Sequence, residues 1–440
     1  MNSTTGLHRG LGRMDVVALT LNTIVGAGIF GLPAALYAAA GSLSLAVLGG
    51  AFLLIAAVAV CAAEVASRFE TTGGPVLYAR EALGPLGGFT VGWLLYLTRL
   101  ATSGAIVVVM LDYAEALWPT LAAPLPRGIA ITLFLAGIAA LNLRGVVQGA
   151  LLGNLLVVLK LAPLLVLAPL GLALGGWPAV VDAPAVQVDA LGAAFLLAFF
   201  ACMGFEQATI VAGELRRPAR DLPIGMLGGF LLAGLLYAAL LLACQGMVPE
   251  LASSKRPIAE LALAVFGAAG ATVVAVTAVL SCAGNLSTSI LVTPRVLFAL
   301  AEQGEIPPVL ARVSGSTRVP SVAIALTAAI VCVLTLTGTF VHLATIAVIA
   351  RMLMYCSICL ALVLLRRRSA APLTVPGARW LAALAILACA GVMSTASVEA
   401  LRAVGIALLG GYTLRLAWRY ARPSGSASPA TLQATGDTLP

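Results

Sequence analysis

Twelve apolar segments run along this chain, and most approach or exceed the roughly 20 residues that a helix needs to cross a bilayer. They cover residues 14–40, 43–66, 87–113, 128–142, 149–174, 192–213, 224–246, 269–300, 320–338, 341–365, 379–397 and 400–418. Charged residues account for 10% of the 440 residues and apolar residues for 61%, whereas a soluble domain carries about 25% charged residues. So few charges cannot coat a water-soluble body of this size, which excludes a soluble enzyme. The segments predict an all-α polytopic membrane protein with twelve transmembrane helices.

Most of the positively charged residues of the chain lie in the loops between these segments. With the N-terminus in the cytoplasm, 18 of the 25 Lys and Arg residues fall on the cytoplasmic side, 4 on the outer side and 3 within helices. This asymmetry agrees with the positive-inside rule. The net charge of +8 therefore reports topology and does not imply nucleic acid as a partner. It predicts a multi-pass protein of the plasma membrane, the bacterial inner membrane, with both termini in the cytoplasm.

Cysteine and histidine usage bears on catalysis and on metal binding. All eight cysteines lie within apolar segments, so no disulfide framework is predicted. Cys356 and Cys359 form a CxxC pair, but the further ligands that zinc requires do not accompany them. The chain has two histidines and no HExxH or GxSxG pattern, which argues against a membrane-embedded enzyme. We therefore predict no cofactor, no metal and no enzymatic activity.

The first apolar segment does not read as a continuous helix. Gly26, Gly28 and Gly31 fall within six residues, and Pro33 follows closely. Glycines at such spacing often form a packing face between membrane helices. They also leave the backbone unshielded, and unwound backbone at membrane depth survives only where it lines a protected cavity. The segment is therefore a candidate broken helix.

A second interruption lies in the sixth segment, at 199–206, where Gly204 and Glu206 occur near mid-depth. The two interruptions are five helices apart, and five is an odd number, so a second set of five helices enters the membrane with the opposite orientation. Transporters built from inverted repeats have broken helices at matching positions, which form a central binding site. Helix packing without a binding role is the alternative interpretation.

A broken helix offers groups that suit an α-amino acid. The half-helix after a break begins with unpaired N–H groups, and the half before it ends with unpaired carbonyls. Free N–H groups near Gly26 to Gly28, aided by the helix dipole, suit a carboxylate. Free carbonyls around Thr23 to Val25 and Phe200 to Cys202 suit an ammonium group. The backbone groups alone thus indicate amino acids as the substrate class.

Four motifs resemble the amino acid–polyamine–organocation (APC) superfamily of permeases, and they occur in the right order. They are GAGIFGLP at 26–33, TGGPVLYAREALGPLGGFTVGW at 72–93, FFACMGFEQATIVAGELRRPARDLPIG at 199–225 and TPRVLFALAEQGEIPPVLARV at 293–313. The chain is similar to bacterial proton-coupled amino acid transporters and to basic amino acid/polyamine antiporters. The resemblance implies a five-plus-five inverted-repeat (LeuT-like) fold with broken helices 1 and 6, alternating access, and two further helices. The implied division is a cytoplasmic tail at 1–13, a transport core at 14–365, two helices at 366–422 and a disordered cytoplasmic tail at 423–440.

The resemblance also implies a substrate site made by the two breaks. The carboxylate is expected on the backbone of Gly26, Ala27 and Gly28, and the amine on carbonyls of Ile24, Val25, Ala201 and Cys202. Phe200 or Phe205 is expected to cover the substrate side chain. Glu206 follows the Gly-x-Glu pattern of the family's sixth helix; it has either a functional role or only stabilises the break. The complete expected set is Ile24, Val25, Gly26, Ala27, Gly28, Ile29, Phe200, Ala201, Cys202, Gly204, Phe205 and Glu206.

Lys160 lies about eleven residues into the fifth segment, roughly 16 Å along a helix. A charge at that depth is costly, and such residues mark coupling sites. LLVVLKLAPLLVL resembles the fifth helix of proton-coupled relatives, where a lysine takes the place of a sodium ion. The resemblance therefore implies proton coupling, in which the ammonium bridges carbonyls of the first helix to polar groups on helix eight, with Asn285, Thr288 and Ser289 as the expected partners there. The alternative is a permanently charged lysine that holds the helices together.

Arg99 and Arg351 lie within the third and tenth segments. A guanidinium at that depth must be paired or solvated. Both arginines are candidates for pairing with Glu64, Glu206 or helix carbonyls, and either is a candidate contact for a substrate carboxylate.

Taken together, these residues predict a secondary active transporter of amino acids, coupled to protons through Lys160. Exchange of amino acids or polyamines without proton coupling is the alternative. No selectivity ring of the kind found in channels is recognisable. The pattern leaves open which amino acid is carried and whether the protein is a monomer or a homodimer.

Overall fold

The computed structural model describes residues 11–69, 74–144, 150–175, 188–210, 215–314, 317, 319–368 and 371–421. Most of the predicted N-terminal tail and all of the predicted tail at 423–440 lie outside the described residues. Within them, all the regular secondary structure is helical. The α-helices are α1 (Arg13–Ile24), α2 (Gly28–Ala40), α3 (Ser44–Ala66), α4 (Gly74–Ala114), α5 (Pro124–Leu143), α6 (Ala150–Gly175), α7 (Val188–Ala201), α8 (Gln207–Ile210), α9 (Pro218–Met247), α10 (Pro257–Glu302), α11 (Ser321–Thr337), α12 (Phe340–Leu365), α13 (Ala378–Ser394) and α14 (Val398–Ala421).

Seven helical stretches of the described chain are long and apolar enough to cross a membrane. They are Gly28–Ala66, Gly74–Ala114, Pro124–Leu143, Arg220–Met247, Pro257–Glu302, Phe340–Leu365 and Val398–Ala421, the first of which contains both α2 and α3. Shorter apolar helices occupy Leu159–Gly175, Ala190–Ala201, Ser321–Thr337 and Ala378–Ser394. Every apolar segment of the sequence thus contains helix, and the protein is an all-helical, multi-pass membrane protein.

Two of the long helices are divided by glycines in the left-handed region of backbone space. Gly84 in α4 has φ 79°, and Gly267 in α10 has φ 70°. Nothing lies within 4 Å of the position that a Cβ would take at either glycine, so conformation alone requires glycine there. The apolar segments 87–113 and 269–300 begin just after these kinks, so the long straight part of each helix is the apolar part.

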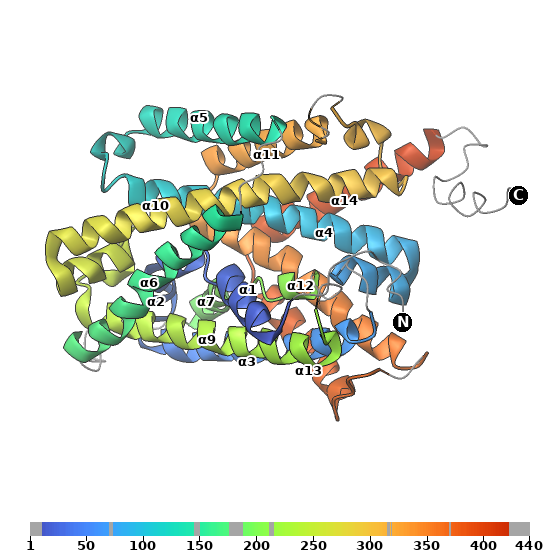
Figure 1. Cartoon of the computed structure of the whole chain (residues 1–440), viewed down its shortest axis with the longest axis horizontal. Coiled ribbons are helices and arrows are strands. Elements are labelled where there is room, and N and C mark those ends of the chain that lie inside the picture. Colours follow the sequence, from blue (N-terminus) through green and yellow to red (C-terminus); the bar gives the residue numbers. More distant parts are fainter. Residues whose placement is uncertain are drawn as a thin grey trace, which may run out of the picture.

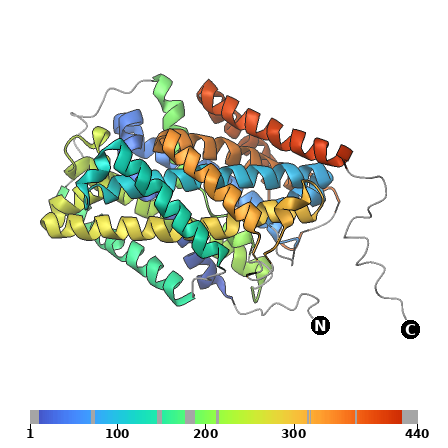
Figure 2. The same ribbon diagram turned by 90° about the horizontal axis from the view of Figure 1, so that it is seen from above.

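Most of the long helices run along the long axis of the molecule, the horizontal in Figure 1. Helix α4 packs mainly against α12 and α10, while α9 packs against α1, α6 and α3. Helix α2 packs against α7, and α5 against α11. Helix α14 lies at the periphery, as the red ribbon in Figure 2 shows. Of the membrane-length helices, α4 and α12 are the most deeply buried, so the interior is built around this pair.

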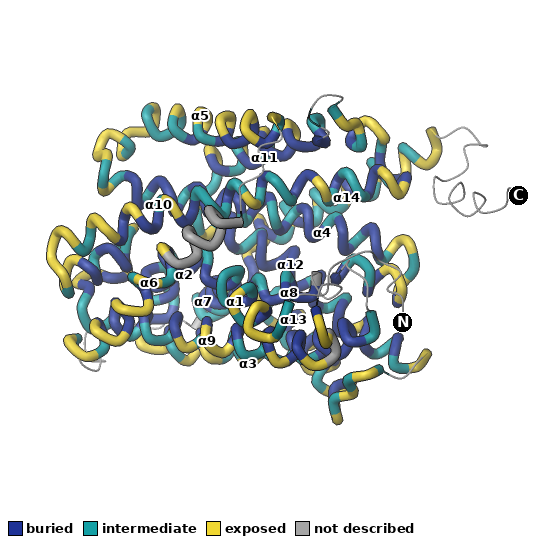
Figure 3. Tube along the Cα trace, viewed as in Figure 1, coloured by how far each residue is buried: buried dark blue, intermediate teal, exposed yellow. Residues whose placement is uncertain are grey.

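Exposed residues, yellow in Figure 3, occur along the outward faces of the bundle, and many of them are large and apolar. Leu53 is 75% exposed, Leu133 67% and Trp380 82%. In water, a continuous surface of such side chains drives association. In a bilayer the hydrocarbon covers it, so the outward faces of these helices are the lipid-facing faces.

Candidate functional site

The first break separates α1 from α2 at residues 25–27. The amide of Val25 still donates to Leu21 O (2.9 Å), but the amide of Gly26 turns back to Ile24 O (2.8 Å). Helix α2 then starts afresh at Gly28. The first amides of a helix have no partner in a preceding turn, so Gly28 and Ile29 present N–H groups at the positive end of the α2 dipole.

Gly28 lies against side chains from two other helices. A Cβ at Gly28 would come within 3.1 Å of Tyr237 Oη on α9 and 3.4 Å of Phe200 Cδ1 on α7. The hydroxyl of Tyr237 also donates to Ile24 O (3.3 Å). A Cβ at Gly26 would meet Asn285 Nδ2 on α10 at 3.7 Å. The first break is thus enclosed by α7, α9 and α10.

The second break separates α7, which ends at Ala201, from α8, which begins at Gln207. Gly204 has φ 117°, and a Cβ there would lie 2.8 Å from Thr23 O of the first break. The hydroxyl of Thr23 donates to Gly204 O (3.1 Å). The two breaks therefore touch each other directly, and this contact requires glycine at position 204.

Glu206 closes the second break from within. Its Oε2 accepts from the amide of Gly204 (3.2 Å) and from the hydroxyl of Tyr355 on α12 (2.8 Å). Its Oε1 forms an ion pair with Arg351 Nη1, also on α12. The side chains of Glu206 and Arg351 are 2% and 6% exposed. The carboxylate thus makes the contacts of a residue that stabilises the break.

The two phenylalanines considered as a cover for the substrate lie apart. Phe200 is next to Gly28 and meets Phe340 edge-on, with ring centroids 5.7 Å apart. Phe205 is fully buried between Tyr355 (5.2 Å) and Phe230 (6.2 Å). Phe200 therefore faces the first break, whereas Phe205 belongs to an aromatic cluster behind the second. The remaining expected site residues are buried beside the two breaks, namely Ile24, Val25, Ala27, Ile29, Ala201 and Cys202.

Lys160 on α6 is 3% exposed, and its Nζ donates to Asn22 O (2.8 Å), near the end of α1. None of the three partners expected on α10 shares a hydrogen bond with it among the described residues. Thr288 is exposed and bonds to Gly284 O of its own helix (3.1 Å).

The other two expected partners on α10 serve different contacts. Ser289 pairs with Ser103 on α4 (2.7 Å), and Asn285 lies beside Gly26. The spacing of polar residues along α10 could not show that their side chains point in different directions around the helix.

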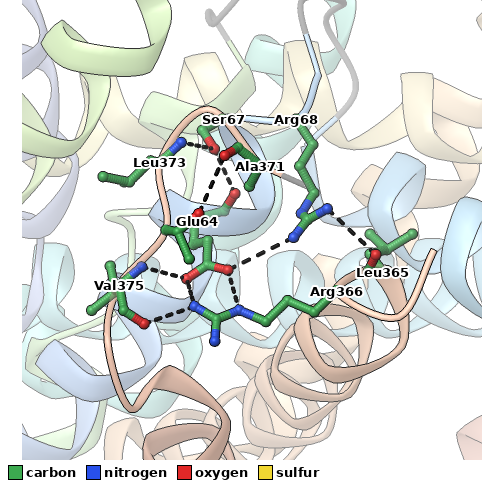
Figure 4. A network of polar contacts seen from close by, with 9 residues as sticks. Glu64, Ser67, Arg68, Leu365, Arg366, Ala371, Leu373 and Val375 are labelled. Carbon is green, nitrogen blue, oxygen red and sulfur yellow. Dashed lines mark hydrogen bonds and ion pairs between the residues drawn. The ribbon is translucent and has the colours of Figure 1, made fainter. Parts of the chain in front are cut away.

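Glu64 contacts neither of the arginines within helices, in contrast to one of the pairings considered from the sequence. It lies fully buried near the end of α3 and binds Arg366 through both oxygens, each at 2.5 Å (Figure 4). Its Oε2 also accepts from the amide of Val375 (3.0 Å), and Arg68 lies 3.8 Å from its Oε1. This network joins α3 to the end of α12 and to the segment that leads into α13.

Arg99 and Arg351 approach the second break from α4 and α12. Arg351 forms the ion pair with Glu206 described above, and Arg99 Nη2 donates to the side-chain oxygen of Gln207 (3.1 Å). Among the described residues, no group of three His, Cys, Asp or Glu side chains could hold a metal ion.

Sequence reasoning missed several residues of this region. Gln207 borders the second predicted break, and its polar side chain next to a helix end was an available signal. At Thr23 the carbonyl was predicted, but the hydroxyl contact with Gly204 was not. Tyr355 lies four residues after Arg351, on the same helix face, which was also readable. Tyr237 gave no signal, because a single tyrosine in an apolar helix is common.

An all-helical, multi-pass membrane protein whose two interrupted helices meet in its interior has the features of a membrane transporter. Comparison with known proteins agrees. A family model described as amino acid permease matches residues 11–405. The serine/threonine exchanger SteT of Bacillus subtilis is 26% identical over 384 residues, covering 83% of this chain and 85% of the relative. An uncharacterized transporter of Mycobacterium tuberculosis is 32% identical over 343 residues, covering 76% and 74%.

The chain therefore belongs to the amino acid permease family of the APC superfamily. It is a transporter and not an enzyme, and the family supports an amino acid as its small-molecule substrate.

Proposed function

We propose that this permease is a secondary active transporter that carries amino acids across the plasma membrane by alternating access. Twelve membrane spans, arranged as two inverted repeats of five plus two further helices, make up the proposed architecture. The observation that carries the proposal is the contact between Thr23 and Gly204, which joins two helix breaks from distant parts of the chain. Broken helices that meet at the repeat interface form the substrate site of such transporters.

The packing of the helices supports two bodies that move against each other. Helices α1, α2, α3, α7 and α9 pack mostly with one another, and α4, α5, α10 and α11 form a second group. Both breaks belong to the first group, while Arg99, Ser103 and Asn285 belong to the second. A site between the two groups opens to one side of the membrane or the other as the groups rock.

In the proposed site, the substrate carboxylate binds the first-turn amides of α2, and the ammonium binds free carbonyls at the ends of α1 and α7. Phe200 covers the substrate from the side of α7.

An experiment on Gly28 tests this arrangement. Gly28→Ala adds one methyl group, 3.1 Å from Tyr237 Oη, where it narrows the space at the amides. We expect amino acid affinity to fall at least tenfold, or about 1.4 kcal/mol.

The measurement is thermal stabilisation of the purified protein by amino acids, since a ligand of the folded state raises its apparent stability. Gly137→Ala on α5 is the matched control, because nothing lies within 4 Å of a Cβ there. Unchanged affinity in Gly28→Ala would show that the glycine only packs helices.

Proton coupling through Lys160 is the second part of the proposal. Its ammonium group is buried against a carbonyl near the end of α1, so its charge bears directly on the segment that leads into the first break. A buried amine without a carboxylate partner is easily deprotonated, and loss of the proton removes a charge-assisted hydrogen bond to α1. Binding of substrate at the break and binding of a proton at Lys160 are thereby linked.

Exchange without proton coupling is the competing mode, and the name of the Bacillus relative favours it. Transport into proteoliposomes separates the two. With proton coupling, an inward pH gradient drives uptake into vesicles that contain no amino acid. Lys160→Ala should abolish this stimulation, while Lys255→Ala, at the other lysine and largely exposed, should keep it. Uptake that needs internal amino acid and ignores the gradient would establish exchange.

The charge asymmetry of the loops supports the bacterial inner membrane as the location, with both termini in the cytoplasm. Protease protection of a tag at each terminus in sealed vesicles tests this orientation. Protection of the two tags to different extents would contradict an even number of spans.

A further inference from the structure

The second break holds more positive than negative charge. Two guanidinium groups, Arg99 and Arg351, approach residues 206 and 207, where Glu206 is the one carboxylate in contact with either among the described residues. An unbalanced charge in a buried site is costly unless an anion joins it.

Arg351 is committed to the break. Its guanidinium pairs with Glu206, which is held at the same time by Tyr355 and by the amide of Gly204. This pairing neutralises the acid of the second break, which would otherwise repel an anionic ligand.

Arg99 is left with a neutral partner. Its Nη2 donates to the amide oxygen of Gln207, and its Nε is buried without a hydrogen-bond partner. A guanidinium has five N–H donors in a planar fork that fits a carboxylate with two parallel hydrogen bonds. The unused donors of Arg99 are therefore suited to a carboxylate that the protein itself does not provide.

Two other clusters of charge among the described residues contain more acidic partners. Near the end of α4, Asp112 and Glu115 face Arg127 and Lys255, two acids against two bases. At the Glu64 network, two arginines share one acid, and backbone carbonyls of Leu365 and Val375 each accept from one of the arginines. Each of these four cations thus has an acid within ion-pair distance, whereas Arg99, like Lys160, has none among the described residues.

The second break is in contact with the last turn of α1, next to the first break. Glu206 accepts from the amide of Gly204, and Gly204 contacts Thr23, which lies two residues before Val25. Arg99 meets the other end of the second break at Gln207, so its unused donors belong to the same interior region as the first break.

We propose that Arg99 binds an anionic side chain of the substrate, so that this permease carries acidic amino acids such as glutamate and aspartate. The inference rests on the proposed function, because it takes the α-carboxylate to bind at the first break. Arg351 acts as a positioning residue, which keeps Glu206 neutralised and aimed away from the substrate.

Isosteric ligands test the inference in the unmodified protein. Glutamine and asparagine have nearly the shapes of glutamate and aspartate without the side-chain charge. We expect glutamate or aspartate to stabilise the purified protein, and to compete for uptake, at concentrations at least tenfold lower than the amides. Preference for the amides or for other neutral amino acids would overturn the inference and leave amino acid transport standing. Absence of binding by any amino acid would overturn the proposed function itself.

A charge series at position 99 provides the second measurement. Arg99→Gln should remove the preference for glutamate over glutamine, whereas Arg99→Lys should keep part of it, because the charge remains. Arg402→Gln, at an exposed arginine of α14, is the matched control and should keep the full preference. A glutamate preference that survives Arg99→Gln would also overturn the inference. If Arg99→Gln does not fold, the comparison of isosteric ligands in the unmodified protein still decides.

Discussion

The two helix breaks of this permease touch each other but are stabilised in different ways. The first, at 25–27, is held by neutral groups and by one lysine that reaches α1 from outside it, with Tyr237 and Lys160 donating to carbonyls. The second, at 202–206, is held by its own acidic side chain, since Glu206 accepts from Gly204 within the break and pairs with Arg351.

The difference indicates that the two breaks have different roles. At the first break no side chain among the described residues accepts a hydrogen bond from the amides of Gly28 and Ile29, so these amides are suited to a ligand. At the second break the protein has supplied its own carboxylate, so an amide there is already satisfied. The first break is suited to bind substrate, and the second to hold the charge that surrounds it.

Removal of the Glu206 carboxylate should lower stability more than the other substitutions, because this carboxylate is the group that distinguishes the second break from the first. Glu206→Ala leaves Arg351 buried without its ion pair, and loss of one partner of a buried pair costs about 3–5 kcal/mol. We expect a marked loss of thermal stability in detergent. The double variant Glu206→Leu with Arg351→Met should recover most of it. Equal stability of Glu206→Ala and wild type would mean that the second break does not depend on its acid.

Alanine at the two glycines compares the breaks directly. Gly204→Ala forces a Cβ into a positive-φ position and to 2.8 Å from Thr23 O, which should cost about 2–3 kcal/mol. At Gly26 the nearest atom to a Cβ is 3.7 Å away and φ lies outside the left-handed region, so Gly26→Ala should change stability by less than about 1 kcal/mol. Thermal unfolding of both variants measures the difference, and equal losses would contradict the distinction drawn here.

The smallest effect is expected at the hydroxyl that supports the first break. Tyr237→Phe removes one hydrogen bond to Ile24 O while keeping the ring. One such bond contributes about 1 kcal/mol to the free energy of unfolding. Because Ile24 O borders the proposed ammonium site, amino acid affinity should change several-fold with little change in stability. Tyr412→Phe, whose hydroxyl pairs with Thr90 far from the breaks, should leave affinity unchanged. A stability loss larger than that of Gly204→Ala would reverse the ranking of the two breaks.

Much of the fold was readable because it depends on local composition. The apolar segments contain the helices, and the kinks at Gly84 and Gly267 fall just before two of them. At Gly204 a positive φ and the close approach of Thr23 O exclude a side chain, and at Gly28 a Cβ would come within 3.1 Å of Tyr237 Oη. Gly26 lies in the first interruption, where a Cβ would have room. The partners of buried charges were foreseen only in part, as Lys160 shows: it binds a carbonyl of α1, as expected, but none of the three polar residues expected on α10.

The sequence by itself determined that this chain is a helical membrane protein, which family it belongs to and where its helices break, because hydrophobicity, charge asymmetry and glycine act within a few residues. The tertiary structure alone decided which partner each arginine meets. Arg99 and Gln207 are 108 residues apart, and no periodicity along the chain connects two side chains at that distance. Packing of α4 and α12 against the second break brings Arg351 to Glu206 and Arg99 to the neutral Gln207, and that surplus of positive charge, invisible in the order of residues, points to the charge of the substrate.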